Sequence, residues 1–166
     1  MVERNPVPSR ELRLQSYTGQ DIPNWIDAEA SPGMIELARA TYSGLLGWVR
    51  SVGAPTGRYN CHGLTFAGRR TNIPRPGETS RGLIDTILRQ DRFAPIPDSL
   101  SVQVGDIALW RREGDVDHTG IVVSVQTEAP RTVFVWSMWG GLGEFVHPAQ
   151  ATPYDDCQIE YWRLGG

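Results

Sequence analysis

The spacing of apolar residues changes near Val102. Before it, apolar residues recur every three or four positions in segments broken by proline and glycine, which predicts helices. After it come short runs rich in β-branched and aromatic residues, which predict strands at residues 106–111, 118–125, 132–138, 144–147 and 158–163. Helices followed by strands are typical of an α+β fold. We therefore expect N-terminal helices packed on a mostly antiparallel sheet of about five or six strands.

The first helix is predicted to run from Ser31 to near Gly53. Ser31 is a favourable N-cap because its hydroxyl can accept a backbone N–H, and Pro32 suits the first helical position. We expect its buried face to consist of Met34, Leu37, Ala38, Thr41, Leu45 and Trp48.

Two shorter helices are predicted to follow. One begins at Asn60 or Cys61 and buries Leu64 and Ala67. Residues 71–78 form a loop, and another proline-broken loop spans residues 93–99. Between these loops, Thr79 or Ser80 is expected to cap a helix that buries Leu83, Ile84, Ile87 and Leu88.

The chain has 166 residues, which suits one ordinary domain with a core of its own. Residues 1–30 hold scattered prolines and little periodicity, so we expect an irregular N-terminal arm, anchored by Trp25 and Ile26. Residues 31–166 are expected to form the single domain.

Charge and hydropathy exclude several partners. The net charge of -3 and the pI near 5.6 lack the basic excess of a nucleic-acid binder. The charged, proline-broken N-terminus has no apolar segment of a cleaved secretory signal. No apolar run reaches the length of about 18 residues that predicts a membrane span. We therefore expect a protein that is cytoplasmic or exported without a cleaved N-terminal signal.

Cys61 is the first candidate catalytic residue. The chain has two cysteines, too few for a disulfide-stapled scaffold, so both are expected to be free thiols. Cys61 falls at a predicted helix N-terminus, where backbone N–H groups can stabilise a thiolate and an oxyanion. His118 opens a predicted strand directly after a polar turn, which would hold its imidazole on a rigid element as the base.

Three motifs in order resemble the NlpC and CHAP families of papain-like cysteine peptidases and amidases. They are Tyr-Asn-Cys-His-Gly at residues 59–63, Gly-Asp-Ile-Ala-Leu-Trp at 105–110 and Asp-His-Thr-Gly-Ile-Val-Val at 117–123. The resemblance covers roughly residues 55–147. It implies a papain-like fold with Cys61 as nucleophile at a helix N-terminus and His118 as base.

The resemblance also implies a third polar residue that orients His118 from the next strand. Ser137 occupies about that position, where relatives have His, Asn or Gln; His147 competes for the role and Glu144 is a weaker candidate. A serine hydroxyl stabilises an imidazolium less than a carboxylate does. Residues expected to line the substrate cleft are Tyr59, Asn60, His62, Trp136, Trp139 and His147. Because adjacent helical residues point about 100° apart, His62 is not expected to act as the in-line base.

The leading hypothesis is a cysteine-dependent amide hydrolase that acts on peptidoglycan peptides without a metal or cofactor. Its expected partners are a peptide or glycopeptide substrate and, for a secreted toxin or effector, a cognate inhibitor or immunity protein. One alternative is a cytoplasmic thiol hydrolase acting on another amide or thioester, and another is an inactive papain-like binding module. A zinc site of Cys61, His62, His118 and His147 is disfavoured because no Cys-x-x-Cys or His-x-x-x-His spacing occurs.

Overall fold

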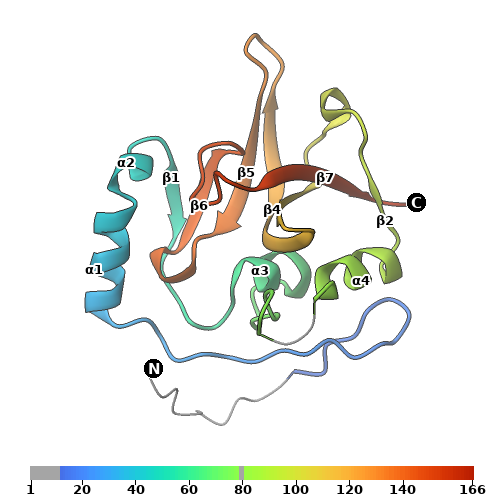
Figure 1. Cartoon of the computed structure of the whole chain (residues 1–166), viewed down its shortest axis with the longest axis horizontal. Helices are drawn as coiled ribbons and strands as arrows, with labels where there is room; N and C mark the ends of the chain where they lie inside the picture. The colour runs from blue at the N-terminus through green and yellow to red at the C-terminus, as the bar shows by residue number, and fades with distance from the viewer. Residues whose placement is uncertain (1–11, 79–80) are drawn as a thin grey trace.

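A mixed α+β architecture is seen in the computed structural model, which describes residues 12–78 and 81–166 (Figure 1). One antiparallel sheet has the strand order β1-β6-β5-β4-β3-β7-β2. Its seven strands are β1 (Arg50–Gly53), β2 (Phe93–Pro95), β3 (Ile107–Arg112), β4 (Asp115–Gln126), β5 (Thr132–Met138), β6 (Glu144–Pro148) and β7 (Gln158–Leu164). The expected α+β class is confirmed, but the sheet is larger than the five or six strands predicted.

The helices precede most of the sheet in the chain. They are α1 (Pro32–Thr41), α2 (Ser43–Leu46), α3 (Cys61–Ala67) and α4 (Leu83–Gln90), with the short 3-10 turns η1 (Ser99–Ser101) and η2 (Gly140–Leu142). Figure 1 shows α3 and α4 side by side below the sheet and α1 at its left margin. Within the described residues, no helix has the length and apolar character needed to cross a membrane.

The prediction of one helix from Ser31 to near Gly53 was wrong in its second half. Ser31 caps α1 as expected, by accepting the Met34 N–H, but the helix breaks at Tyr42, and α2 ends at Leu46 with Gly47 as its C-cap. The chain then extends and β1 pairs with β6. Glycines at positions 44 and 47 weaken the helix, and pairing with β6 satisfies the backbone of the segment that follows.

The predicted buried face of this first helix was also wrong in part. Met34, Leu37 and Trp48 are 65%, 70% and 78% exposed. Instead, α1, α2 and the turn after them pack on Trp139, Leu142 and Phe145 through Ala38, Tyr42, Leu45, Leu46 and Val49.

The other added strand, β2, lies in the loop predicted at residues 93–99. Phe93 and Pro95 pair with Leu164 and Trp162 of β7 at the end of the sheet. Pro95 is tolerated there because an edge strand leaves one side without hydrogen bonds. Its short length gives the sequence no periodic signal to detect.

The second and third helices form where predicted and bury the predicted residues, but the predicted cap of the third helix was wrong. Leu64 and Ala67 of α3 are buried, as are Ile84, Ile87 and Leu88 of α4; Leu83 packs against the same core. The predicted caps Thr79 and Ser80 of α4 lie outside the described residues. The residue at the N-cap position is Gly82, in a left-handed conformation.

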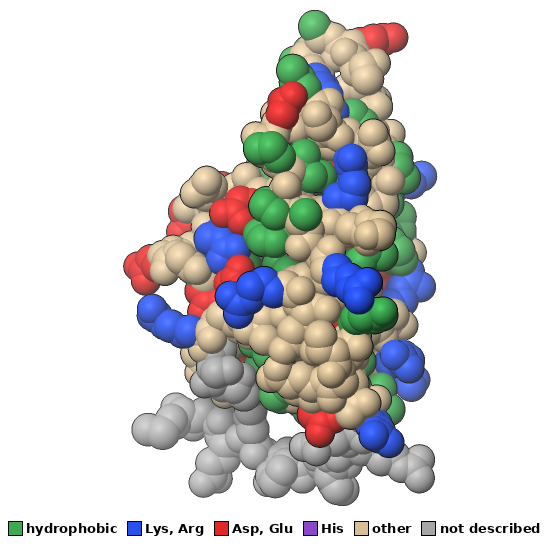
Figure 2. All heavy atoms as spheres, turned by 90° about the vertical axis from the view of Figure 1, so that its right-hand side faces the viewer, with side chains coloured by type: hydrophobic (Ala, Val, Ile, Leu, Met, Phe, Trp, Pro, Cys, Tyr) green, Lys and Arg blue, Asp and Glu red, His purple; other side chains and the backbone are tan. Residues whose placement is uncertain are grey.

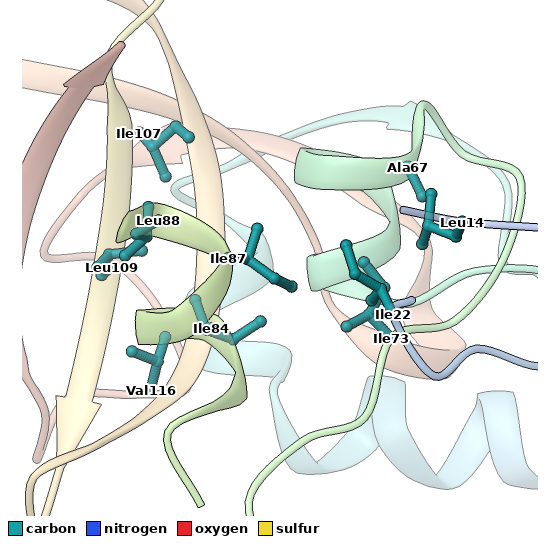
Figure 3. Close-up of a cluster of buried hydrophobic side chains, with 10 residues drawn as sticks. All are labelled: Leu14, Ile22, Ala67, Ile73, Ile84, Ile87, Leu88, Ile107, Leu109 and Val116. Carbon is teal, nitrogen blue, oxygen red and sulfur yellow. The ribbon is translucent and has the colours of Figure 1, made fainter. Parts of the chain in front are cut away.

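The arm is irregular over its described part, residues 12–30. Its anchors are Leu14 and Ile22, which lie beside Ala67 and Ile73 and belong to the same buried cluster as α4 (Figure 3). Trp25 and Ile26, the predicted anchors, are only half-buried. Trp25 contributes through its backbone, which exchanges hydrogen bonds of 3.2 and 2.8 Å with Asn72.

The sheet has a core on each face. Ile107, Leu109 and Val116 pack with α4 on one face, whereas Trp110, Val122 and Val135 belong to a second cluster on the other. The surface on the side of α4 and β2 carries basic and acidic side chains interspersed with small apolar areas (Figure 2).

Candidate active site

The segment before and within α3 is built to hold Cys61 in place. Asn60 is the N-cap, and its Oδ1 accepts the backbone N–H groups of Gly63 at 2.9 Å and Ile73 at 3.2 Å. Its Nδ2 donates to the Ile73 carbonyl at 2.7 Å. A Cβ at position 63 would lie 1.8 Å from the Thr71 carbonyl oxygen, so only glycine allows this approach. Asn60, predicted to bind substrate, therefore fastens the loop at 71–73 to the start of α3.

The Cys61 thiol is buried, with 3% of the residue exposed. It clusters with Leu64 and Met138, against which Tyr59, Ile121 and Trp136 pack. Burial raises the pKa of Cys61 to about 11, although a hydrogen bond from the Thr119 backbone N–H and the positive charge of Arg75 act in the opposite direction. The thiol is therefore protonated at neutral pH.

His62 is the histidine that contacts the thiol. Its Nδ1 lies 3.8 Å from Cys61 Sγ and 3.0 Å from the Thr119 hydroxyl. Burial, together with the positive charge of Arg75, lowers the pKa of His62 to about 3. The imidazole is therefore neutral, and it ties the start of α3 to β4 through Thr119.

His118 is fully buried on β4, directly opposite Trp110 of β3. Its ring stacks on Tyr154 with centroids 4.0 Å apart and planes 15° apart. Neither ring nitrogen has a hydrogen-bond partner within the described part of the chain. Burial lowers the pKa of His118 well below its usual value, and the charges of His147, His62 and Arg75 act in the same direction.

Cys61 and His118 are neighbours without being in hydrogen-bond contact. Consecutive strand residues point to opposite faces of a sheet. Thr119 and Ile121 point toward α3, whereas His118 shares the other face with Trp110. The thiol lies 3.8 Å from the His62 imidazole, which contacts the hydroxyl of Thr119, the residue after His118 in β4.

Ser137 and His147 are brought together with each other. His147 Nδ1 lies 2.8 Å from the Pro148 carbonyl, which can only accept, so this nitrogen carries the proton. Nε2 is then an acceptor, and the Ser137 hydroxyl, 2.8 Å away, donates to it. Ser137 in turn accepts the Trp139 indole N–H at 3.0 Å. Among the described residues, neither Ser137 nor His147 hydrogen-bonds to His118.

Trp139, predicted to line the cleft, is 4% exposed and its ring lies 5.0 Å from that of His147.

Burial lowers the pKa of His147 to about 4. All three histidines are therefore neutral at physiological pH.

Glu144 occupies the centre of a separate buried network. It is 1% exposed and accepts hydrogen bonds from the Tyr59 hydroxyl, from Arg69 Nη2 at 2.9 Å and from the Trp136 indole at 2.9 Å. Tyr59 and Trp136, both predicted to bind substrate, thus have their polar atoms engaged here. Burial and the hydrogen bond to Glu144 raise the pKa of Tyr59 to about 12.

The alternative of a zinc site finds no matching geometry. Within residues 12–78 and 81–166, no group of three or more His, Cys, Asp or Glu side chains is placed to hold a metal ion. Cys61, His62, His118 and His147 therefore do not converge as ligands.

Two residues that contribute to the candidate site could not be identified from the sequence. Thr119 acts partly through its backbone N–H, which no residue type reveals. Tyr154 lies in the irregular segment between β6 and β7, far in sequence from the His118 ring that it covers. The aromatic ring in Pro-Tyr-Asp-Asp is a weak signal at best.

Comparison of the chain with protein-family models, with characterised proteins and with solved structures finds no match.

Proposed function

We propose that the protein is a cysteine-dependent amide hydrolase with Cys61 as nucleophile and His118 as general base. The observation that carries the proposal is the buried, unpartnered imidazole of His118, which directly precedes Thr119, the residue whose hydroxyl contacts the His62 imidazole beside the Cys61 thiol. An unsatisfied buried polar group costs about 1–3 kcal/mol, so it calls for a functional reason. An imidazole that must alternately accept and release a proton provides one.

The chemistry starts from two neutral groups. The proton of the Cys61 thiol passes to a ring nitrogen of His118 as the sulfur attacks the substrate carbonyl. The imidazolium then protonates the leaving amine as the C–N bond breaks, which leaves a thioester on Cys61. Water attacks that thioester, with His118 again taking the proton, and the acid product and free thiol are released.

In the proposed mechanism, the described conformation is the resting state before substrate binds. Cys61 is buried and Tyr154 covers one face of the His118 ring. Catalysis therefore requires that Tyr154 move away and that the His118 side chain turn from the face it shares with Trp110 toward the thiol. Many enzymes assemble their catalytic groups only when the substrate closes or opens a segment of this kind.

The substrate class rests on the motif resemblance to NlpC and CHAP enzymes. By that analogy the scissile amide belongs to a peptidoglycan peptide, and the partner is a peptide or glycopeptide. The same chemistry would serve a thiol hydrolase that acts on another amide or on a thioester. Identification of the cleaved bond separates these substrates.

A second candidate is a binding module with this fold that does not catalyse. The raised pKa of Cys61 and the hydrogen bond between Ser137 and His147 favour it, because the nucleophile is not ionised and the base has no orienting partner. A catalytic Cys61 and a merely buried one differ in their response to a substrate-like electrophile.

The test is covalent labelling with a vinyl sulfone attached to a peptidoglycan-type peptide, read by intact-protein mass spectrometry. Wild type and Cys157→Ala should each gain one adduct, and Cys61→Ala should gain none. His118→Asn should label at least about a hundredfold more slowly, the usual contribution of a general base. Equal labelling of wild type and His118→Asn, or an adduct only at Cys157, would favour the binding module.

A further inference from the structure

A second site is a groove with a cavity volume of about 780 Å³ at the β1 end of the sheet. Its walls come from the α2–β1 connection and from β1, β4, β5 and β6, together with Arg69 after α3. The side chains that matter for recognition are Trp48, Arg50, Val52, Arg69, Phe134 and Trp136. The candidate catalytic residues do not line it.

The floor of the groove continues the sheet face that α3 covers. Arg50, Val146 and Trp136 lie directly opposite one another on β1, β6 and β5, so their side chains share a face. Trp136 also packs on the Cys61 cluster under α3. A ligand in the groove would therefore lie beside α3 without contacting Cys61, which is buried and does not line the groove.

The charges of the groove are basic, although the chain as a whole is acidic. Arg50 is exposed and forms no ion pair with any described residue. Arg69 is 47% exposed; its guanidinium lies 4.3 Å above the Trp136 ring, and only Nη2 is taken by Glu144. The lining contains no acidic side chain. Planar guanidinium groups of this kind recognise carboxylates.

The walls supply the apolar part of recognition. Trp48 is 78% exposed and Val52 is 44% exposed, which is unusual for apolar side chains gathered on one surface. The volume falls within the range of about 300–1,000 Å³ typical of sites for small ligands and short peptides. The site therefore combines aromatic walls with cationic groups.

The free edge of β1 favours a peptide over other ligands that carry a carboxylate group. The strand β1 is the last in the sheet, so one side of its backbone has no strand partner. An extended peptide can hydrogen-bond to such an edge and place alternate side chains on one face. Arg50 and Val52 of β1 both line the groove, and a register shift between Ser51 and Gly53 places Val52 at a β-bulge.

We propose that this groove binds a short extended peptide that carries a carboxylate side chain flanked by apolar residues. The apolar side chains pack on Trp48 and Phe134, and the carboxylate binds Arg50 and the free edge of Arg69. The proposal does not depend on catalysis by Cys61.

The experiment measures binding of the peptide N-acetyl-Leu-Glu-Leu-amide by titration calorimetry and by two-dimensional NMR of the indole N–H groups. N-acetyl-Leu-Gln-Leu-amide is the matched neutral probe. Wild type and Cys61→Ala should bind the Glu peptide with a dissociation constant below about 1 mM. The Gln peptide should bind at least about fivefold more weakly, and the Trp48 indole signal should shift.

Variants at positions outside the buried Glu144 network test whether the peptide binds in this groove. Arg50→Gln and Trp48→Ala, both at exposed positions, should each weaken binding at least about fivefold, while Arg89→Gln on α4 should bind as wild type does. Absence of saturable binding, equal affinity for both peptides, or equal affinity of Arg50→Gln and wild type would overturn the proposal. So would a concentration-dependent dimer that buries Trp48, measured by sedimentation, because the occupant would then be a second copy of the chain.

Discussion

The carboxylate of Glu144 lies 2.9 Å from the guanidinium of Arg69, and this contact joins β6 to the residue just beyond the C-terminal end of α3. The same carboxylate accepts a hydrogen bond from the hydroxyl of Tyr59, which lies two residues before Cys61. One buried acid therefore holds both ends of the short helix that carries the nucleophile. The arrangement explains how a helix of only seven residues keeps a fixed position on the sheet.

Loss of the Glu144 charge should destabilise the protein. Glu144→Gln keeps the shape of the side chain but removes charge-assisted bonds to Arg69, and its amide nitrogen cannot accept the hydrogen bonds that a carboxylate oxygen accepts. We expect the free energy of unfolding to fall by about 2 kcal/mol in urea titrations. Glu128→Gln, at the exposed tip of the β4–β5 hairpin, is the control and should change it by less than about 0.5 kcal/mol. Equal stability of the two variants would show that the network contributes nothing.

Removal of the Tyr154 ring should open the site. Tyr154→Ala uncovers one face of His118, and we expect the Cys61 thiol to react with iodoacetamide at least about tenfold faster in a Cys157→Ser background. Stability should fall by about 2 kcal/mol because a partly buried aromatic ring is lost. Tyr154→Phe keeps the stacked ring and should react as wild type does. An unchanged rate in Tyr154→Ala would mean that this ring does not close the site.

The three buried histidines should make the fold sensitive to acid. Their pKa values are lowered in the folded state, to about 3 for His62 and about 4 for His147, so the unfolded chain binds protons first as the pH falls below about 6.5. The stability that they contribute is present above that pH and is lost as the pH falls toward about 4 for His147 and about 3 for His62. Each should contribute a slope of up to about 1.4 kcal/mol per pH unit.

His118→Phe isolates the contribution of one histidine. Phenylalanine preserves the stack on Tyr154 and removes two unpartnered nitrogens, so stability at neutral pH should be equal or higher. Between pH 6 and 4, the free energy of unfolding of the variant should fall less steeply with pH than that of wild type. The difference in slope should correspond to about one proton, or about 1.4 kcal/mol per pH unit. The comparison cancels the contributions of the carboxylates, because they are the same in both proteins. Parallel slopes for the two proteins would contradict the buried, neutral state of His118.

The reactivity of Cys61 should follow its raised pKa. In a Cys157→Ser background, the rate of alkylation should rise about tenfold per pH unit and approach its plateau only near pH 11, because the thiolate is the reacting species. Stopped-flow alkylation or mass spectrometry at increasing pH measures this profile. A plateau near the ordinary thiol value of about 8.5 would contradict the buried thiol.

Much of the sheet can be predicted from sequence, because β3 to β7 alternate or concentrate apolar residues over five or more positions. The strands β1 and β2 cannot, since three or four residues give no periodic signal and their pairing depends on partners distant in the chain. The first helix was predicted to be too long because the pairing of β1 with β6, which follows the glycines at 44 and 47, depends on a partner distant in the chain.

The candidate site could also be predicted only in part. The cap at Asn60 and the position of Cys61 at the start of a helix follow from local sequence, because capping involves residues three apart. The stack of Tyr154 on His118 and the bond between Ser137 and His147 bring together different strands and loops, and only the register of the sheet determines them. The motif order indicated which residues matter but not how they are paired.

Hydrolysis of purified peptidoglycan fragments, with the products identified by mass spectrometry, tests most directly whether Cys61 is the nucleophile of an amide hydrolase. Wild type and Cys157→Ala should each make one defined amide cut. Cys61→Ala should produce no cut, and His118→Asn should be at least about a hundredfold slower. A cut that persists in Cys61→Ala would contradict the assignment of the nucleophile, and no cut by wild type would contradict the proposed substrate class.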